Sequence, residues 1–139
     1  MFDLNEENQL YWFKRQTLEM GTMPINFELL GTLIGIALYN GIQVDLPLAP
    51  AIFKLLVGEK PNMSDLEAWQ PSVAQSMKDI LTHSDKEYFE AIYRTFSEDL
   101  TLFGATNTVD LKPNGRDIFV TPDNKEEYVR LYIEYEFET

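Results

Sequence analysis

The longest apolar pattern in the chain runs from Phe27 to Tyr39, and its residues are apolar on nearly every side of a helix. Asn26 can cap the start of such a helix, and Asn40-Gly41 offers a left-handed stop. A helix that is hydrophobic all round is usually buried on all sides. The uncharged run from Leu29 to Tyr39 is well short of the ~20 residues that span a bilayer. The pattern therefore predicts a central core helix.

Shorter patterns lie on either side of this helix. The apolar run Leu10-Tyr11-Trp12-Phe13, between polar neighbours, predicts a buried strand. A second helical face contains Ile52, Leu55 and Leu56 and ends at Gly58. The polar connector that follows, residues 59–62, contains a proline and is the best internal boundary in the chain. We therefore expect two subdomains, residues 1–58 and residues 59–139.

The second part mixes helical and strand patterns. Ser64-Asp65-Leu66-Glu67 has the form of a capping box and opens a short helix that ends before Pro71. A longer helix is expected from about Ser72 to His83, because apolar residues recur there at helical spacing. These apolar residues are Val73, Met77, Ile80 and Leu81. A helical turn followed by a strand near Thr95 is expected next.

Two short apolar runs near the end of the chain flank a turn sequence. Val109-Asp110-Leu111 and Ile118-Phe119-Val120 enclose Lys112-Pro113-Asn114-Gly115, which predicts a β-hairpin. Thr121-Pro122 then provides a cap and a proline at the first position of a closing helix. Together the patterns predict an α+β fold, in which a mainly helical first part is followed by a small subdomain of helices and β-hairpins.

The composition limits the partners and the chemistry. The chain has 23 acidic and 11 basic residues, a formal charge of −12, which argues against nucleic acid and anionic membrane surfaces as partners. A basic protein surface suits this charge, although solubility alone accounts for it equally well. The absence of cysteine excludes disulfides, thiolate metal sites and thiol nucleophiles within the chain. The first residues lack the pattern of a secretory signal, so we expect an intracellular protein.

Candidate catalytic groups are scarce. The single histidine, His83, lies where a helix is expected to end, and a C-terminal cap is its simplest role. With one histidine and no cysteine we expect no metal site, and no glycine-rich loop indicates a cofactor. No pairing of a nucleophile with a base can be identified, so the chain alone is not expected to be an enzyme. Its apolar stripe at Val73, Met77 and Ile80 either binds a partner or packs on the 109–120 hairpin.

Several segments, taken in order, resemble the amino-terminal lobe of HECT-type ubiquitin-protein ligases. They are Leu10–Phe13, Phe27–Asn40, Ser64–Glu67, Gln75–Leu81, Thr95–Ser97, Val109–Thr121 and Asn124–Val129. The run Val109-Asp110-Leu111-Lys112-Pro113-Asn114-Gly115-Arg116-Asp117-Ile118-Phe119-Val120-Thr121 is the most distinctive of them. The resemblance covers essentially the whole chain but only part of the family's domain. The chain is therefore expected to be an excised piece or a natural truncation of a longer ligase.

The resemblance implies a function for the parent protein. Full-length members accept ubiquitin as a cysteine thioester from a conjugating enzyme and transfer it to substrate lysines. The catalytic cysteine belongs to a carboxy-terminal lobe, so this chain alone would not catalyse the transfer. Residues 1–58 would be part of the large helical subdomain, and residues 59–139 the small subdomain that docks the conjugating enzyme, with its following helix. The implied partners are a conjugating enzyme and ubiquitin itself, without cofactor, metal, nucleic acid or membrane insertion, in the cytoplasm or nucleus.

The resemblance also implies a docking groove, position by position. Its residues would be Val73, Ser76, Met77, Ile80, His83, Ile92 and Arg94. His83 stands where a larger aromatic residue is common in the family, and Arg94 where an aliphatic residue is usual. A further groove residue would come from beyond Thr139. We expect Met77 to be an exposed anchor, so that Met77→Ala would weaken docking and barely change stability. The alternative is a non-catalytic structural or adaptor domain in which the stripe at residues 73, 77 and 80 is buried.

Overall fold

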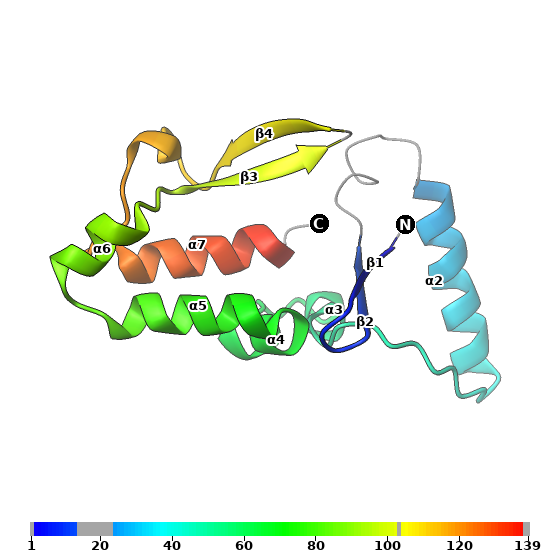
Figure 1. Ribbon diagram of the computed structural model, residues 1–139. Coiled ribbons are helices and arrows are strands. Elements are labelled where there is room, and N and C mark those ends of the chain that lie inside the picture. Colours follow the sequence, from blue (N-terminus) through cyan, green and yellow to red (C-terminus); the bar gives the residue numbers. More distant parts are fainter. Residues whose placement is uncertain (1, 14–23, 103, 138–139) are drawn as a thin grey trace. The chain divides into compact units, whose positions relative to one another are not determined.

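The computed structural model of the protein describes residues 2–13, 24–102 and 104–137 (Figure 1). Within them, six α-helices and a short 3-10 helix accompany two antiparallel two-stranded sheets. This confirms the α+β fold class. The chain divides into two compact units, one up to Ala49 and one from Pro50 onward. The division lies before the connector at residues 59–62, which is part of the second unit.

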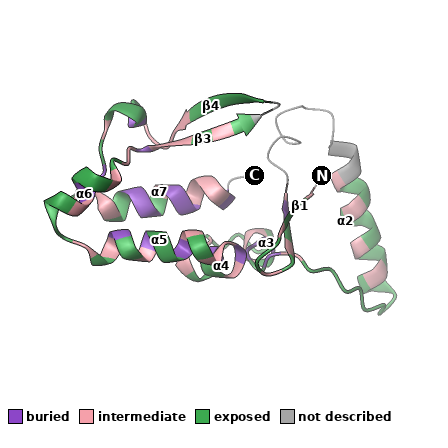
Figure 2. Cartoon of the chain, viewed as in Figure 1, coloured by how far each residue is buried: buried purple, intermediate pink, exposed green. Residues whose placement is uncertain are grey.

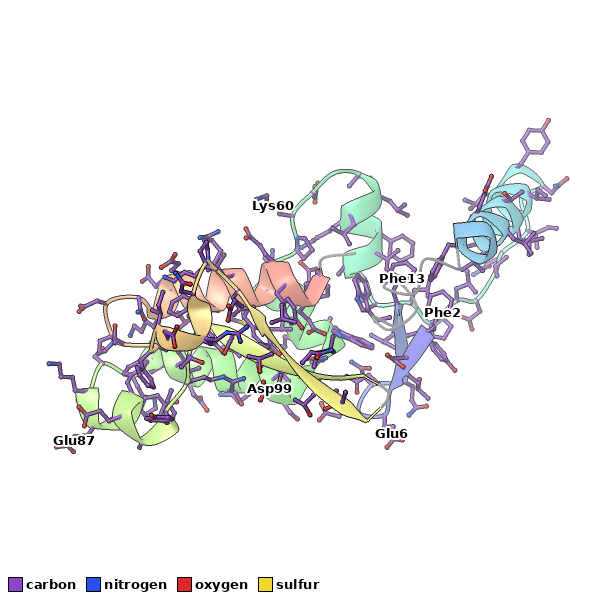
Figure 3. The ribbon with its side chains drawn as sticks, turned by 90° about the horizontal axis from the view of Figure 1, so that it is seen from above. Phe2, Glu6, Phe13, Lys60, Glu87 and Asp99 are labelled. Carbon is purple, nitrogen blue, oxygen red and sulfur yellow. The ribbon has the colours of Figure 1, made fainter. Side chains whose placement is uncertain are left out.

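The first unit contains a β-hairpin of β1 (Phe2–Asn5) and β2 (Leu10–Phe13), paired from Phe2↔Phe13 to Asn5↔Leu10. The predicted strand at residues 10–13 is thus confirmed, and Trp12 is its buried side chain. Phe2 and Phe13, labelled in Figure 3, stack with ring centroids 5.6 Å apart. Both rings also meet Phe27 edge-on, at 6.2 and 5.4 Å. An aromatic cluster is therefore the main apolar contact of this hairpin.

Helix α2 (Pro24–Tyr39) forms where the apolar pattern predicts it, and Gly41, with φ +66°, follows its end. Its burial, however, was predicted wrongly, because none of the side chains described along it is buried (Figure 2). Leu33 is 55% exposed and Tyr39 is 93% exposed. The physical reason is the lack of covering elements. Within the first unit, a hairpin of four-residue strands faces a helix of 16 residues and contacts it through Phe27.

The second unit opens with α3 (Ala51–Leu56) and α4 (Met63–Trp69). A capping box starts α4 as predicted, but it uses Asn62 and Asp65 rather than Ser64 and Glu67. The Asn62 side chain accepts from the backbone N–H groups of Ser64 and Asp65, and the Asp65 carboxylate accepts from the backbone N–H of Asn62. Asp65 is buried and also pairs with Lys54 of α3 at 2.7 Å. This pair joins α3 to α4 within the second unit.

Helices α5 (Pro71–Thr82) and α7 (Lys125–Phe137) lie side by side and antiparallel in the second unit (Figure 1). Lys125, at the start of α7, bonds to the end of α5. At the other end, the Glu136 carboxylate accepts from Trp69 Nε1 and Gln70 Nε2. The core is built around this pair of helices. Its largest fully buried side chains are Tyr128, Phe96, Leu66, Met77 and Val120.

The strand pairing differs from the predicted hairpin. Strand β3 (Ser97–Leu102) pairs with β4 (Ala105–Asp110), and Gly104 takes the left-handed conformation between them. Residues 109–111 and 118–120 do not pair with each other, because the segment 94–96 bonds to both. Phe96 accepts from Leu111 N–H and donates to the Ile118 carbonyl, and Arg94 accepts from Val120 N–H. The correct partner of these runs is therefore distant in sequence.

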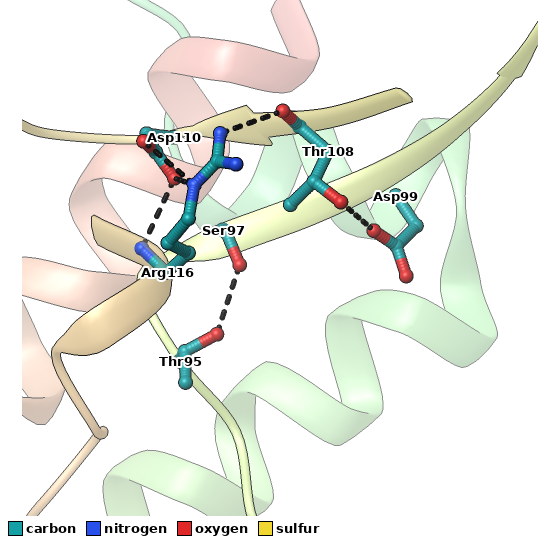
Figure 4. Close-up of polar contacts among 6 residues, drawn as sticks. All are labelled: Thr95, Ser97, Asp99, Thr108, Asp110 and Arg116. Atoms are coloured by element: carbon teal, nitrogen blue, oxygen red, sulfur yellow. Dashed lines mark hydrogen bonds and ion pairs between the residues drawn. The ribbon is translucent and has the colours of Figure 1, made fainter. Parts of the chain in front are cut away.

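The turn sequence after β4 leads into the 3-10 helix η1 (Gly115–Asp117). Gly115 lies against the Phe96 backbone so closely that any side chain at this position would collide with it. Arg116 fixes the turn from outside, as Figure 4 shows: its Nε pairs with the Asp110 carboxylate at 3.1 Å and its Nη2 donates to the Thr108 carbonyl. The Lys-Pro-Asn-Gly run is thus a turn packed onto residue 96.

The closing helix begins later than predicted. Thr121-Pro122 lie in a turn in which the Asn124 side chain accepts from Thr121 N–H at 2.7 Å, and α7 starts at Lys125. Between Asp85 and Ser97 the order is α6 (Lys86–Ile92), then a single bridge from Thr95 to Phe119. Of the helices in the part of the chain that the structure describes, none combines the length and apolarity that crossing a membrane requires.

Candidate functional site

The predicted docking residues all lie in the second unit, on α5, at its end, or at and just after the end of α6, and they divide by exposure. Met77 and Ile80 are buried, with exposed fractions of 0% and 3%. Ser76 is exposed. Val73, His83, Ile92 and Arg94 are half-buried. A partner can therefore reach only part of the predicted set.

Met77 is a core residue in this structure, so the expectation of an exposed anchor was wrong. Ala74, Met77 and Ile80 recur at a spacing of three on α5 and are all buried, as the purple bands of this helix in Figure 2 indicate. The reason is that α5 packs against α7. The apolar pattern of α5 does not show which element will cover that side of the helix. Met77 and Ile80 therefore contribute to the core of the second unit and are not available to a partner.

The accessible edge of α5 runs beside this buried stripe. Ser76 and His83 are two helical turns apart, which places them on one side of the helix. His83 is the C-cap of α5, as the sequence predicts: its backbone N–H and its ring Nδ1 both lie within bonding distance of the Asp79 carbonyl, at 3.1 and 2.8 Å. A carbonyl oxygen only accepts, so Nδ1 carries the proton and the neutral ring has its acceptor at Nε2.

The His83 ring connects α5 to α6. It stacks on the Tyr88 ring at a centroid distance of 3.9 Å and an angle of 6°. Tyr88 in turn meets the buried Phe89 edge-on at 5.3 Å. Ile92 lies one turn further along α6 than Tyr88, at the spacing that places two side chains on the same side. His83 is therefore held in one orientation between two helices.

Arg94 has internal partners. Its Nη2 contacts both Glu98 carboxylate oxygens, at 3.0 and 3.2 Å, and its guanidinium lies 5.9 Å from the centre of the Tyr128 ring. The Tyr128 hydroxyl donates to Glu98 Oε1 at 2.8 Å. Burial, together with the nearby Glu98 charge, raises the pKa of the Tyr128 hydroxyl well above its ordinary value. The Arg94 guanidinium is thus engaged by Glu98 and Tyr128 at the edge of the core.

The structure also reveals an exposed aromatic pair that the sequence patterns did not single out. Tyr93 is 74% exposed and Phe119 is 44% exposed, and their ring centroids are 4.8 Å apart. Tyr93 is the C-cap of α6 and has a positive φ of 48°, which is uncommon for a residue of this size. The pair was missed because Phe119 was assigned to the wrong hairpin. Tyr93 directly follows Ile92 in the chain.

The exposed side of α6 is acidic. Asp85, Glu87 and Glu90 are exposed, with Lys86 as the only cation among residues 85–92. Figure 3 shows Glu87 at the outer edge of this helix. In the described parts of the chain, no three His, Asp or Glu side chains gather closely enough to hold a metal ion.

A separate concavity lies elsewhere on the second unit. It has a volume of about 980 Å³ and is lined mainly by α7 and by residues 60–63 and 109–111, with Leu55 and Leu81 beside them. None of the predicted docking residues lines it. The accessible docking residues lie on and beside α5 and α6 instead.

Comparison with known proteins identifies the family. The family model described as HECT-domain (ubiquitin-transferase) matches residues 1–139. The human "Probable E3 ubiquitin-protein ligase HERC4" is 34% identical over 137 residues, which are 99% of this chain and 13% of that protein. The "E3 ubiquitin-protein ligase TOM1-like" of Neurospora crassa is 35% identical over 122 residues, 84% of this chain and 3% of that protein.

A third relative, the human "Probable E3 ubiquitin-protein ligase HECTD2", is 28% identical over 151 residues, which are 97% of this chain and 19% of that protein. The chain thus spans a small part of the length of each of these relatives. Because the family model covers the whole chain, the resemblance seen in the sequence is confirmed: the protein belongs to the HECT-domain family of ubiquitin ligases.

Proposed function

We propose that the second unit docks a ubiquitin-conjugating enzyme for a ligase that passes ubiquitin through a cysteine thioester. The docking surface is the α5–α6 face. It consists of Val73, Ser76, His83, Ile92, Tyr93 and Phe119. The observation that carries the proposal is the exposed Tyr93–Phe119 pair, of which Tyr93 directly follows Ile92, one of the expected docking positions.

Two properties of the α5–α6 face support this function. Exposed aromatic residues such as Tyr93 provide large contact area and are enriched at protein interfaces. The exposed carboxylates of Asp85, Glu87 and Glu90, on and beside α6, add negative charge to this part of the second unit, which favours a basic partner and speeds its encounter. A conjugating enzyme that presents basic and apolar groups together would satisfy both properties.

The chain supplies docking without the chemical step. A thioester requires a thiolate, and the chain has no cysteine. Incubation with activating enzyme, charged conjugating enzyme and ubiquitin is expected to leave no adduct on this chain that a reducing agent removes. A reducible adduct on the chain would overturn this division of roles.

Substitution at Ser76 tests the docking surface. Ser76→Arg places a bulky cation in the exposed edge of α5, and we expect it to weaken binding of a conjugating enzyme at least about tenfold, as for a central interface residue. The matched control is Asn107→Arg, which adds the same charge to an exposed position of β4. Titration calorimetry measures both, with thermal unfolding to show that both variants fold. Equal affinities for the two variants would contradict the proposal.

The second candidate function is a structural or adaptor domain, and the burial of Met77 favours it in part. In that case the stripe at residues 73, 77 and 80 only packs the fold. No conjugating enzyme would then bind the chain, and Ser76→Arg would change nothing. The same titration therefore distinguishes the two functions.

A further inference from the structure

Lys125 makes an unusual contact for the first residue of a helix. Its side chain leaves α7 and reaches the end of α5, where Nζ donates to the carbonyls of Leu81, at 2.7 Å, and His83, at 2.6 Å. The bonds join residues 44 and 42 positions apart in the sequence. The amine is partly buried, which strengthens both charge-assisted bonds.

The end of α5 needs such a cation. The last carbonyls of a helix have no partner within it, and they carry the negative end of the helix dipole. The Asp79 carbonyl is bonded by His83, and the Lys78 carbonyl by the Thr82 hydroxyl. The last turn of α5 itself has no basic residue. Lys125 therefore supplies from another helix the charge that α5 lacks.

The same bonds restrain His83. Its carbonyl is held by Lys125, its ring Nδ1 by Asp79, and its ring plane by the stack on Tyr88. The backbone of His83 is extended, with φ −77° and ψ 144°, so the chain turns from α5 toward α6 at this residue. Without the bond from Lys125, one of these three restraints is lost.

We propose that Lys125 is a positioning residue of the α5–α6 face. It does not touch the partner, and it acts by holding His83 and the turn into α6 in the orientation that a conjugating enzyme binds. The proposal rests on the proposed docking function. Lys125 lies outside the α5–α6 face. Its role could not be inferred from its position in the sequence, far from His83.

The first measurement concerns the free chain. His83 is the single histidine, so its ring protons give unambiguous NMR signals, and the Tyr88 ring shields them by stacking. We expect Lys125→Met to move these signals more than halfway toward their unstacked positions, and Lys125→Arg to restore most of the shielding. The matched control is Lys112→Met, which removes an equal charge that pairs with Glu127. It should leave the His83 signals unchanged.

The second measurement is a double-mutant cycle on docking, using the full chain and the conjugating enzyme that binds it most tightly. Lys125→Met is expected to weaken binding about fivefold, and Lys112→Met not at all. If Lys125 acts through His83, the same change made in a His83→Ala background costs no further affinity. A purely structural role would lower affinity equally in both backgrounds.

The outcomes separate this proposal from the docking function. Unchanged His83 signals or unchanged affinity in Lys125→Met, in a chain that binds a conjugating enzyme, overturn the positioning role and leave docking intact. A full affinity loss in the His83→Ala background also overturns it. If the unsubstituted chain binds no conjugating enzyme, both proposals fail together, whatever the His83 signals show. If Lys125→Met unfolds, Lys125→Gln, which removes the charge but keeps a polar side chain, replaces it in both measurements, with the same expected and contradicting results.

Discussion

Helices α2 and α5 each have the opposite exposure to the one that their sequences suggest. The α2 pattern is apolar on nearly every side and predicts burial, yet its described side chains are exposed or half-buried. The α5 stripe was assigned to a partner surface, yet Met77 and Ile80 are buried. The difference lies in what each unit provides. The first unit offers α2 a short hairpin, whereas the second unit lays α7 along α5. An apolar face therefore shows only that a helix can be buried, and its neighbours decide whether it is.

Among substitutions that only remove side-chain atoms, the largest effect is expected at Met77. Met77→Ala leaves a cavity in a fully buried site, so the free energy of unfolding should fall by roughly 2–5 kcal/mol. The matched change in the other helix, Leu33→Ala, removes an exposed side chain and should cost less than about 1 kcal/mol. Denaturant unfolding of both variants measures the difference. Equal losses would show that the two helices do not differ as described.

A smaller effect is expected at Tyr128, which bonds to Glu98 in the core of the second unit. Tyr128→Phe keeps the ring but leaves the Glu98 carboxylate one donor short, so we expect a loss of about 1.5–3 kcal/mol. Chemical denaturation at neutral pH measures this loss. The control is Tyr39→Phe in α2, which removes the hydroxyl of an exposed tyrosine and should have no measurable effect.

The same hydroxyl predicts a pH dependence. The pKa of Tyr128 is raised in the folded chain, chiefly by burial, so the unfolded chain loses this proton first as the pH rises. The stabilisation is complete below the ordinary tyrosine pKa of about 10 and is lost progressively above it. Stability measured between neutral and strongly alkaline pH should therefore decline, and Tyr128→Phe should decline less. An identical slope in both proteins would contradict this assignment.

Capping of α4 should have an effect of about 1 kcal/mol. Asn62→Ala removes the acceptor for two backbone N–H groups and should destabilise the second unit by that amount. Ser64→Ala, at the position that the sequence pattern favoured, should have less effect because Ser64 is not the N-cap. Thermal unfolding of the pair decides between the two registers of the capping box.

Much of the fold could be predicted from the sequence, because local patterns determine where helices form. The apolar spacing on α5 located that helix to within a residue or two, and His83 was correctly identified as its cap. The hairpin at residues 109–120 was wrong because the bonds of Leu111 and Val120 go to the distant segment 94–96. Such pairings depend on the whole chain, and a turn sequence indicates only that the chain reverses.

The candidate site shows the same limit. Of the docking positions that the family resemblance implies, Ser76 is exposed and His83 is half-buried, whereas Met77 is buried because α7 packs against the stripe. That these positions dock a partner stays a prediction. Neither Lys125 nor the Tyr93–Phe119 pair could be found from the sequence. Lys125 bonds to residues 42 or more positions away in the sequence. The Tyr93 and Phe119 rings meet because Thr95 and Phe119 form a β-bridge.

The smallest expected effect on stability is in α2. Leu33→Glu adds a charge to an exposed position and should change the free energy of unfolding by about 0.5 kcal/mol or less. It should nevertheless reduce binding of a hydrophobic dye, because it interrupts an exposed apolar surface. Ile80→Glu, in the buried face of α5, should instead unfold the second unit. A strongly destabilised Leu33→Glu variant would show that α2 is covered.

An NMR titration shows whether the α5–α6 face binds a conjugating enzyme. The isotope-labelled chain would be titrated with a panel of ubiquitin-conjugating enzymes up to high micromolar concentration. We expect the amide shifts to cluster at Val73, Ser76, His83 and Ile92 and to leave α2 unaffected. If every enzyme leaves these residues unmoved, or if the shifts gather on α2 instead, the docking claim is wrong.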